Sequence, residues 1–181
     1  MILFWLVLVL FICLVSIFQI YIPPMIWLKE APILLHPAFL FYGCLTLPFP
    51  QTLSLIFLTG LLNDVLTVPF AQESNFNIGT SILLYLVPGL ILHGLRPVFL
   101  QGRWFTGFLV ALLAAILTPL PSLGQYAIIS FERRSFFYND VIMWRILGPG
   151  VIAIVITPCV FLILSYLAGL VRYRPKLERL A

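Results

Sequence analysis

The stretch QTLSLIFLTGLLNDVL, residues 51–66, is an apolar run that is interrupted near its end by Asn63 and Asp64. Apolar runs of about 18 residues or more recur along the chain, and runs of that length are typical of helices that cross a bilayer. Of the 181 residues, 62% are hydrophobic and only 9% are charged, whereas a soluble domain is about one-quarter charged. The alternating pattern of outer-membrane strands is absent from the sequence. The sequence therefore predicts an all-α integral membrane protein.

Proline and glycine residues divide the chain into predicted spans. We place six spans at residues 2–22, 32–47, 51–68, 78–95, 104–124 and 147–171, which together make residues 1–181 a single six-helix membrane domain. The second span, about 24 Å long by helical rise, is short for a bilayer. Because each proline removes a backbone donor, residues 118–121 (TPLP) predict a kink in the fifth span. We expect residues 148–150 (GPG) to separate a membrane-surface piece from the sixth span.

The basic residues predict the orientation of the chain. Six spans place both termini on one side of the membrane. If the tail is cytoplasmic, the inside holds Arg96, Arg103, Arg172, Arg174, Lys176 and Arg179, and the outside holds Lys29, Arg133, Arg134 and Arg145. The excess of basic residues on the tail side predicts an N-in, C-in topology. The same residues are too scattered for a nucleic-acid interface.

The connection at residues 122–145 mixes aromatic and aliphatic residues with charged ones. This mixture is typical of a segment that lies at the membrane surface. We interpret the connection as an interfacial loop, and a partner-binding surface is the alternative.

Motifs that carry chemistry are absent from the sequence. It contains no H-E-x-x-H, G-x-S-x-G or Walker-type glycine loop. His36 and His93 lie on different segments, and no acidic residue lies at metal-ligand spacing from either. The three cysteines lie far apart in apolar segments, which argues against a C-x-x-C motif. We therefore expect no enzymatic activity, no catalytic residues, no metal site and no cofactor.

Asp64 is the acidic residue that falls inside a predicted span. If the third helix begins near Gln51, Asp64 lies about 20 Å along it, in the outer third of the hydrocarbon core. An ionisable side chain within the membrane costs roughly 2.5–3.5 kcal/mol at the centre and less toward the interface, so it faces the bundle interior or a polar cavity. His36 lies within about 3 Å of the same depth by helical rise, which predicts a hydrogen bond or ion pair between Asp64 and His36, and Arg145 is the second candidate partner. Two roles remain open: a structural polar clamp, shared with Asn63, or a site for a ligand or coupling ion.

Residues 48–91, PFPQTLSLIFLTGLLNDVLTVPFAQESNFNIGTSILLYLVPGLI, resemble the core of the rod shape-determining protein MreD family. In that family a short proline-containing turn leads into a helix that ends G-L-x-x-D, and a glycine opens the next helix. Gly60, Asp64 and Gly79 match this pattern. The size, the six spans and the end of the chain, RILGPGVIAIVITPCVFLILSYLAGLVRYR with its basic tail, fit as well.

The resemblance implies a non-enzymatic component of the bacterial cell-elongation machinery in the inner membrane. Such proteins bind the partner MreC and, through it, help to couple the actin-like cytoskeleton to the peptidoglycan synthases of the lateral wall. Gly60, Asn63, Asp64 and Gly79 would then position the third helix and its loop for partners. The family is also similar in fold to the substrate-binding membrane subunits of energy-coupling-factor vitamin transporters. A transporter subunit that binds a small solute near Asp64, His36 and residues 69–77 is therefore the alternative.

Overall fold

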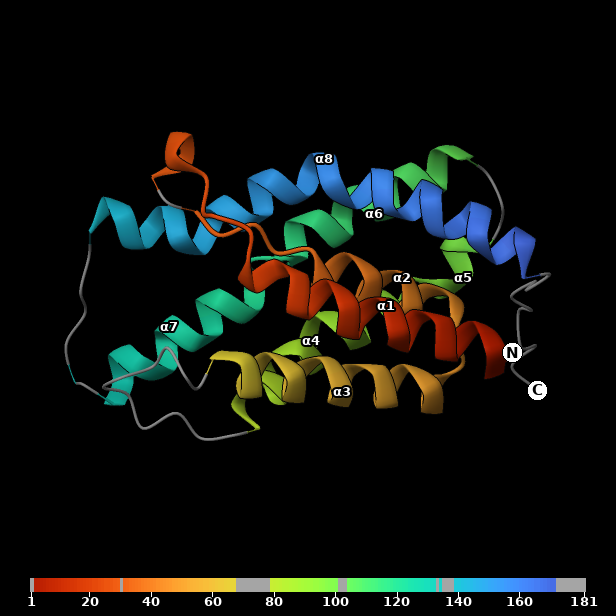
Figure 1. Cartoon of the computed structure of the whole chain (residues 1–181), viewed down its shortest axis with the longest axis horizontal. Helices are drawn as coiled ribbons and strands as arrows, with labels where there is room; N and C mark the ends of the chain where they lie inside the picture. The colour runs from red at the N-terminus through yellow and green to blue at the C-terminus, as the bar shows by residue number, and fades with distance from the viewer. Residues whose placement is uncertain are drawn as a thin grey trace.

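The helices of the protein run mostly along one long axis (Figure 1). The computed structural model describes residues 2–29, 31–67, 79–100, 104–132, 134 and 139–171. In these ranges the elements are the α-helices and one short 3₁₀ helix, η1, without any strand. They are α1 (Ile2–Ile20), η1 (Ile26–Leu28), α2 (His36–Thr46), α3 (Phe49–Thr67), α4 (Thr80–Gly94), α5 (Arg96–Phe99), α6 (Trp104–Leu117), α7 (Leu120–Glu132) and α8 (Asp140–Leu170).

Four of the helical segments are long and apolar enough to cross a membrane. They are Ile2–Ile20, Phe49–Leu66, Phe105–Phe131, which spans most of α6 and α7, and Asp140–Leu170. The α4 helix is apolar but shorter, and α2 is shorter still. The described residues thus form an all-helical fold with four helices able to cross a membrane, whereas the count of six spans stays a prediction.

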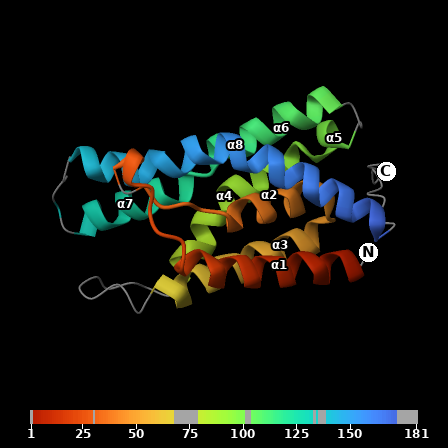
Figure 2. The ribbon, with the colours of Figure 1, turned by 45° about the horizontal axis from the view of Figure 1, so that its top comes forward.

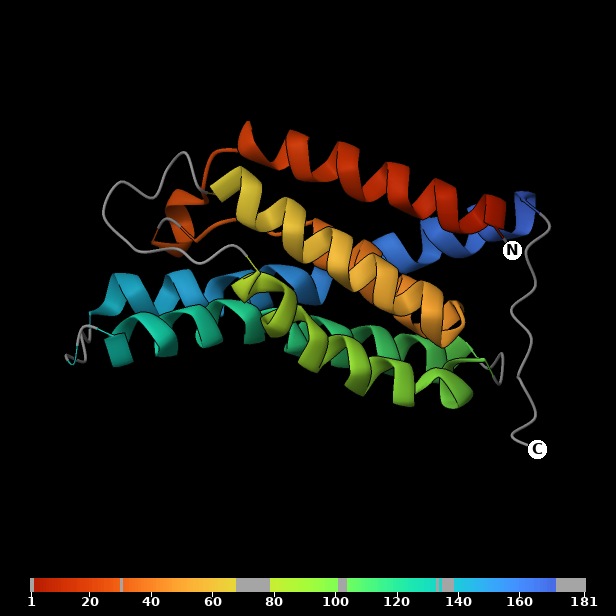
Figure 3. The same cartoon turned by 90° about the horizontal axis from the view of Figure 1, so that it is seen from below.

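The two ends of the bundle differ. The α1 helix begins where α8 ends, and the short α5 lies at this same end, which we call the terminal end (Figure 1). The α3 helix ends and α4 begins toward the opposite end, which we call the distal end. The α7 helix and the first turns of α8 extend beyond the other long helices there (Figures 1 and 3). At 31 residues, α8 is about 46 Å long by helical rise, which exceeds a hydrocarbon core of about 30 Å.

The core is built around α2, which packs against α1, α3, α4 and α8. Phe4, Leu8 and Ile12 recur on one face of α1 and are completely buried, as expected of a helix with one face toward a bundle. Tyr42 of α2 packs edge-on against the ring of Phe161 of α8, with ring centroids 5.3 Å apart. The outer surface is also apolar: Val155 and Leu162 of α8 are 69% and 73% exposed. An apolar exterior of this kind matches contact with lipid tails.

The kink predicted at residues 118–121 is confirmed, because α6 ends at Leu117 and α7 begins at Leu120. The loop expected at residues 122–145 is wrong for most of this segment, since α7 continues to Glu132 and α8 begins at Asp140. Residues 133 and 135–138 lie outside the described residues, and the position of the segment at the membrane surface stays a prediction. This sequence carries enough helix-forming apolar residues to extend both helices past the expected span ends. An exposed ion pair between Lys29 and Asp140, 3.0 Å apart, joins the η1 loop to the start of α8.

The separation predicted at residues 148–150 is also wrong, because α8 continues through them. Pro149 removes the donor of only one helical hydrogen bond, and the two glycines allow close packing. A Cβ on Gly148 would collide with the Cβ of Ala31, and a Cβ on Gly150 would lie 3.0 Å from Cδ of Pro119. The glycines therefore bring α8 close to its neighbours rather than ending it.

Candidate functional site

Asp64 connects the end of α3 to the start of α4. Its side chain is completely buried, and its Oδ2 accepts a hydrogen bond of 2.7 Å from the backbone N–H of Gly79. Gly79 is the N-cap residue of α4 and has a φ of +107°. The positive end of the α4 macrodipole favours a carboxylate at this position. Asp64 thus caps a helix to which it does not belong.

Gly60 lets α3 and α4 approach each other closely one turn before Asp64. A Cβ on Gly60 would lie 2.5 Å from Cα and 2.6 Å from the backbone nitrogen of Ile82. Backbone atoms cannot move aside as a flexible side chain can, so only glycine fits. Figure 3 shows α3 and α4 side by side along their lengths. The close approach of the helices positions the N-terminus of α4 within reach of Asp64.

Asn63 joins a third helix to this pair. Its Nδ2 donates to Oγ of Ser81 on α4 at 3.0 Å, and Nε2 of Gln125 on α7 donates to the same oxygen at 3.1 Å. Ser81 is completely buried. We call Asn63, Asp64, Gly79, Ser81 and Gln125 the α3–α4 junction. Hydrogen bonds within an apolar bundle hold helices in one register.

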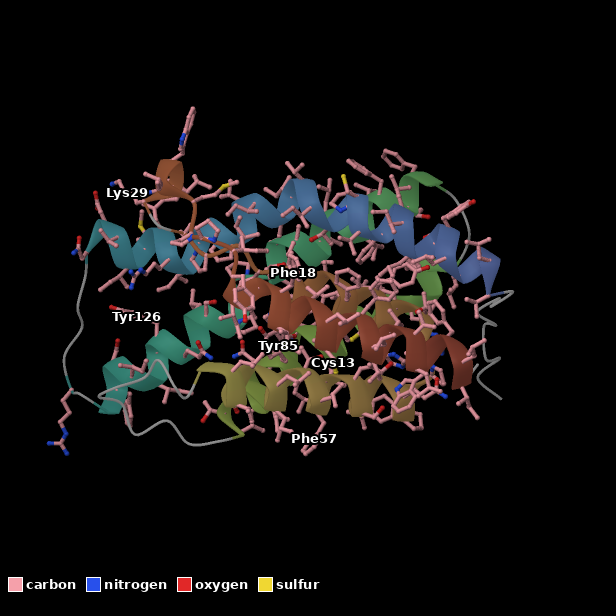
Figure 4. The ribbon with its side chains drawn as sticks, viewed as in Figure 1. Cys13, Phe18, Lys29, Phe57, Tyr85 and Tyr126 are labelled. Atoms are coloured by element: carbon pink, nitrogen blue, oxygen red, sulfur yellow. The ribbon has the colours of Figure 1, made fainter. Side chains whose placement is uncertain are left out.

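His36 belongs to a second polar set, next to the junction along α4. Its Nε2 lies 2.6 Å from the hydroxyl of Tyr85, and its Nδ1 lies 2.8 Å from Oε1 of Gln19. Because an amide oxygen only accepts, Nδ1 carries the proton and donates it to Gln19, and Nε2 accepts from Tyr85. The same Gln19 oxygen accepts the backbone N–H of Leu35 at 3.1 Å. Tyr85 lies inside the bundle, whereas Phe57 points away from it (Figure 4).

The predicted hydrogen bond between Asp64 and His36 is therefore corrected, because both ring nitrogens of His36 have other partners. Helical rise gives the depth of the two residues but does not determine the rotation of their helices. Arg145, the other candidate partner, is exposed on α8, whereas Asp64 is buried. Residues 69–77, which the transporter alternative invokes, lie outside the described residues.

The sequence predicted Gly60, Asn63, Asp64 and Gly79 but not Ser81 of α4 and Gln125 of α7 beside them. It also did not predict the partners of His36, which are Gln19 of α1 and Tyr85 of α4. Gln19 and Gln125 are uncharged amides in helical, largely apolar segments, and that contrast was the signal for them. Ser81 and Tyr85 carry no such signal, because serine and tyrosine occur widely in membrane helices. One turn separates these two residues on α4, so the same helix face serves both polar sets.

The two polar sets connect helices to one another. Among the described residues, no three His, Cys, Asp or Glu side chains gather as a metal site would require. The first set joins α3, α4 and α7 through hydrogen bonds. The second set joins α1, α2 and α4. Such a network fixes the relative positions of five helices.

No protein-family model matches the sequence, and no curated protein or solved structure matches it either. The resemblance to the MreD family accordingly rests on residues 48–91 and on the pattern of spans.

Proposed function

We propose that this protein is a non-enzymatic scaffold of the bacterial cell-elongation complex in the inner membrane, where it binds an MreC-like partner. The wall synthases would join the complex beside it, and the actin-like cytoskeleton would be coupled through the MreC-like partner. This proposal keeps the six passes, which would be α1, α2, α3, α4, the α6–α7 pair and α8. It also keeps both termini on the cytoplasmic side.

The observation that supports the proposal is the hydrogen bond from Gly79 to Asp64. Gly60, Asp64 and Gly79 are the residues that carry the resemblance, and they act on one feature, the packing of α3 against α4. Because they fix a helix pair rather than bind a reactant, a role in presenting a surface to partners follows naturally. Two hydrogen bonds support the same role. Asn63 donates to Ser81 of α4, and Gln125 of α7 donates to the same serine oxygen.

A pull-down of tagged full-length protein from detergent-solubilised membranes tests this proposal. We would compare wild type with Asp64→Ala and Asp64→Asn, and use Asp140→Ala as the matched control, because Asp140 is an exposed carboxylate on α8. Asparagine keeps an oxygen that can accept the Gly79 N–H, whereas alanine does not. We expect recovery of MreC-like and wall-synthase proteins from wild type and Asp140→Ala, reduced recovery from Asp64→Ala, and an intermediate result for Asp64→Asn.

A substrate-binding subunit of a small-solute transporter is the second candidate. The buried polar groups of His36 and Tyr85, with the half-buried Gln19 beside them, favour it. Recovery of ATPase transport subunits or of a bound small molecule, in place of wall-synthesis proteins, would establish this candidate and overturn the scaffold.

A further inference from the structure

The η1 loop, residues 25–29 and 31, projects sideways from the bundle beside the first turns of α8 (Figures 1 and 2). Within it, Trp27 is 98% exposed and Ile26 is 84% exposed. Tryptophan side chains are mostly buried in folded proteins. The loop therefore holds an aromatic and an aliphatic side chain away from the rest of the chain, and the question is what these side chains contact.

Backbone hydrogen bonds close the loop at its base. The N–H of Met25 donates to the carbonyl of Ala31 at 3.0 Å, and the two residues form an isolated antiparallel bridge. The N–H of Lys29 donates to the carbonyl of Ile26 at 3.2 Å. Lys29 itself adopts the left-handed conformation, with a φ of 49°. The exposed Trp27 is thus presented by a closed turn.

Two contacts fasten this turn to α8. Ala31 is completely buried, and it lies so close to α8 that a Cβ on Gly148 would be 2.3 Å from the Cβ of Ala31. Lys29 pairs with Asp140, the first residue of α8, at 3.0 Å. Asp140 and Gly148 lie about 12 Å apart along the helix axis by helical rise. The level of the loop is therefore the level of the first turns of α8.

The lengths of two helices place this level at the edge of the hydrocarbon core. The α1 helix has 19 residues and is about 28 Å long, which nearly matches a core of about 30 Å. Because α1 begins where α8 ends (Figure 1), the same core covers about 20 residues of α8, back to about residue 150. The first turns of α8, and the loop packed against them, then lie at the headgroups. Figure 3 likewise shows the loop beyond the end of α1.

The direction of the loop favours lipid over water. A loop along the bundle axis would reach the aqueous phase, whereas this loop extends across the axis and thus in the plane of the membrane (Figure 1). Phe18 and Tyr21, at the end of α1, are also largely exposed and belong to or directly follow a helix able to span. Exposed aromatic side chains thus continue from the lipid-facing α1 into the loop, at the level where Trp and Tyr are enriched in membrane proteins.

We propose that the η1 loop inserts into the headgroup region of the leaflet at the distal end, with Trp27 and Ile26 at the boundary with the acyl chains. The indole ring suits this boundary, because its apolar body contacts acyl chains while its N–H donates to lipid oxygens. The exposed Lys29–Asp140 ion pair lies toward water, at the start of α8. The loop thereby fixes the depth of α8, whose length exceeds the core. This inference is independent of the proposed scaffold function, because it requires only that α1 and α8 cross the membrane.

Tryptophan fluorescence of the full-length protein in phosphatidylcholine vesicles tests the insertion. The chain has four tryptophans, so the signal of Trp27 is the difference between wild type and Trp27→Phe. This substitution removes no core contact, because Trp27 is exposed. We expect the difference signal to lose most of its intensity to lipids that carry bromine on the acyl chain near the headgroup. It should lose little to lipids with bromine near the acyl ends, or to acrylamide in the water.

Leu162→Trp in the Trp27→Phe background is the matched control, because Leu162 is also largely exposed but lies well inside the span of α8. Its signal should be quenched most by bromine near the acyl ends. Quenching of the Trp27 signal mainly by acrylamide would place the loop in water and overturn the proposal. A depth profile equal to that of Leu162→Trp would place it in the core, and quenching by neither reagent would show that a second copy of the protein covers it. Both results would also overturn the proposal.

Discussion

At Gly60, the fit between α3 and α4 depends on one missing methyl group. In Gly60→Ala the new Cβ would meet backbone atoms of Ile82, so one helix must shift. We expect a loss of about 1–3 kcal/mol in the free energy of unfolding, the usual cost of overpacking. The apparent melting temperature in detergent measures the change. Gly94→Ala, at a site with open space, should differ little from wild type, and equal melting of the two variants would contradict the close approach.

At Gly79, the backbone conformation matters rather than the space. A Cβ there meets no atom within 4 Å, but the φ of +107° is one that side chains rarely adopt. Gly79→Ala should therefore cost about 1–2 kcal/mol in the free energy of unfolding. Gly79→Asn should cost less, because asparagine tolerates positive φ better than alanine does. Thermal unfolding of both variants under one detergent condition checks the order, and alanine as stable as asparagine would refute it.

The importance of single residues could be predicted better than their partners. A carboxylate in an apolar span is visible in any sequence, and its burial follows from the cost of exposing it to lipid. Its partner turned out to be the backbone N–H of Gly79, which no side-chain pattern indicates. The paired hydrogen bonds of His36 depend on helix rotation, and depth along the membrane does not determine rotation.

Among the helices, α2 is short, and its first residue holds it to two neighbouring helices through hydrogen bonds. His36, its first residue, connects α2 to Gln19 of α1 and Tyr85 of α4. In Tyr85→Phe the Nε2 of buried His36 loses its donor, which should cost about 1–3 kcal/mol in the free energy of unfolding. A double-mutant cycle with His36→Phe should give a coupling energy of about 0.5–3 kcal/mol, since the two residues are in contact.

Unfolding of wild type, both single variants and the double variant completes this cycle. Tyr42→Phe is the control for loss of a tyrosine hydroxyl away from His36, because the Tyr42 hydroxyl bonds to Ser165. Additive effects of the His36 and Tyr85 substitutions would show that their contact contributes nothing.

Helix type and order could be predicted from apolar runs, but helix ends near Gly and Pro could not. Pro119 separates two helices, whereas Pro149 lies inside one. Both prolines remove a backbone donor, and the difference lies in tertiary contacts, because Gly148 and Gly150 hold α8 against Ala31 and Pro119. Local sequence patterns do not predict packing between residues that lie far apart in the chain.

For the whole molecule, the orientation in the membrane can be measured by cysteine labelling. In a Cys13→Ser background, Asn139→Cys should react with a membrane-impermeant maleimide on intact cells, because Asn139 is exposed at the distal end. Val98→Cys, at the terminal end, should react only after the membrane is permeabilised. Cys159, exposed on a lipid-facing helix, serves as the unreactive reference. Labelling of Val98→Cys on intact cells would reverse the proposed orientation.

The hydrogen bond between Asp64 and Gly79 closes a ring that contains all the residues between them. Because this hydrogen bond holds the two ends of the segment together, the length of the segment should have little effect on the positions of α3 and α4. Doubling a flexible connection costs only about 0.6 kcal/mol in closure entropy. Related chains could therefore gain or lose residues here without moving α4. An epitope inserted between residues 71 and 76 should therefore leave the register of α3 and α4 unchanged.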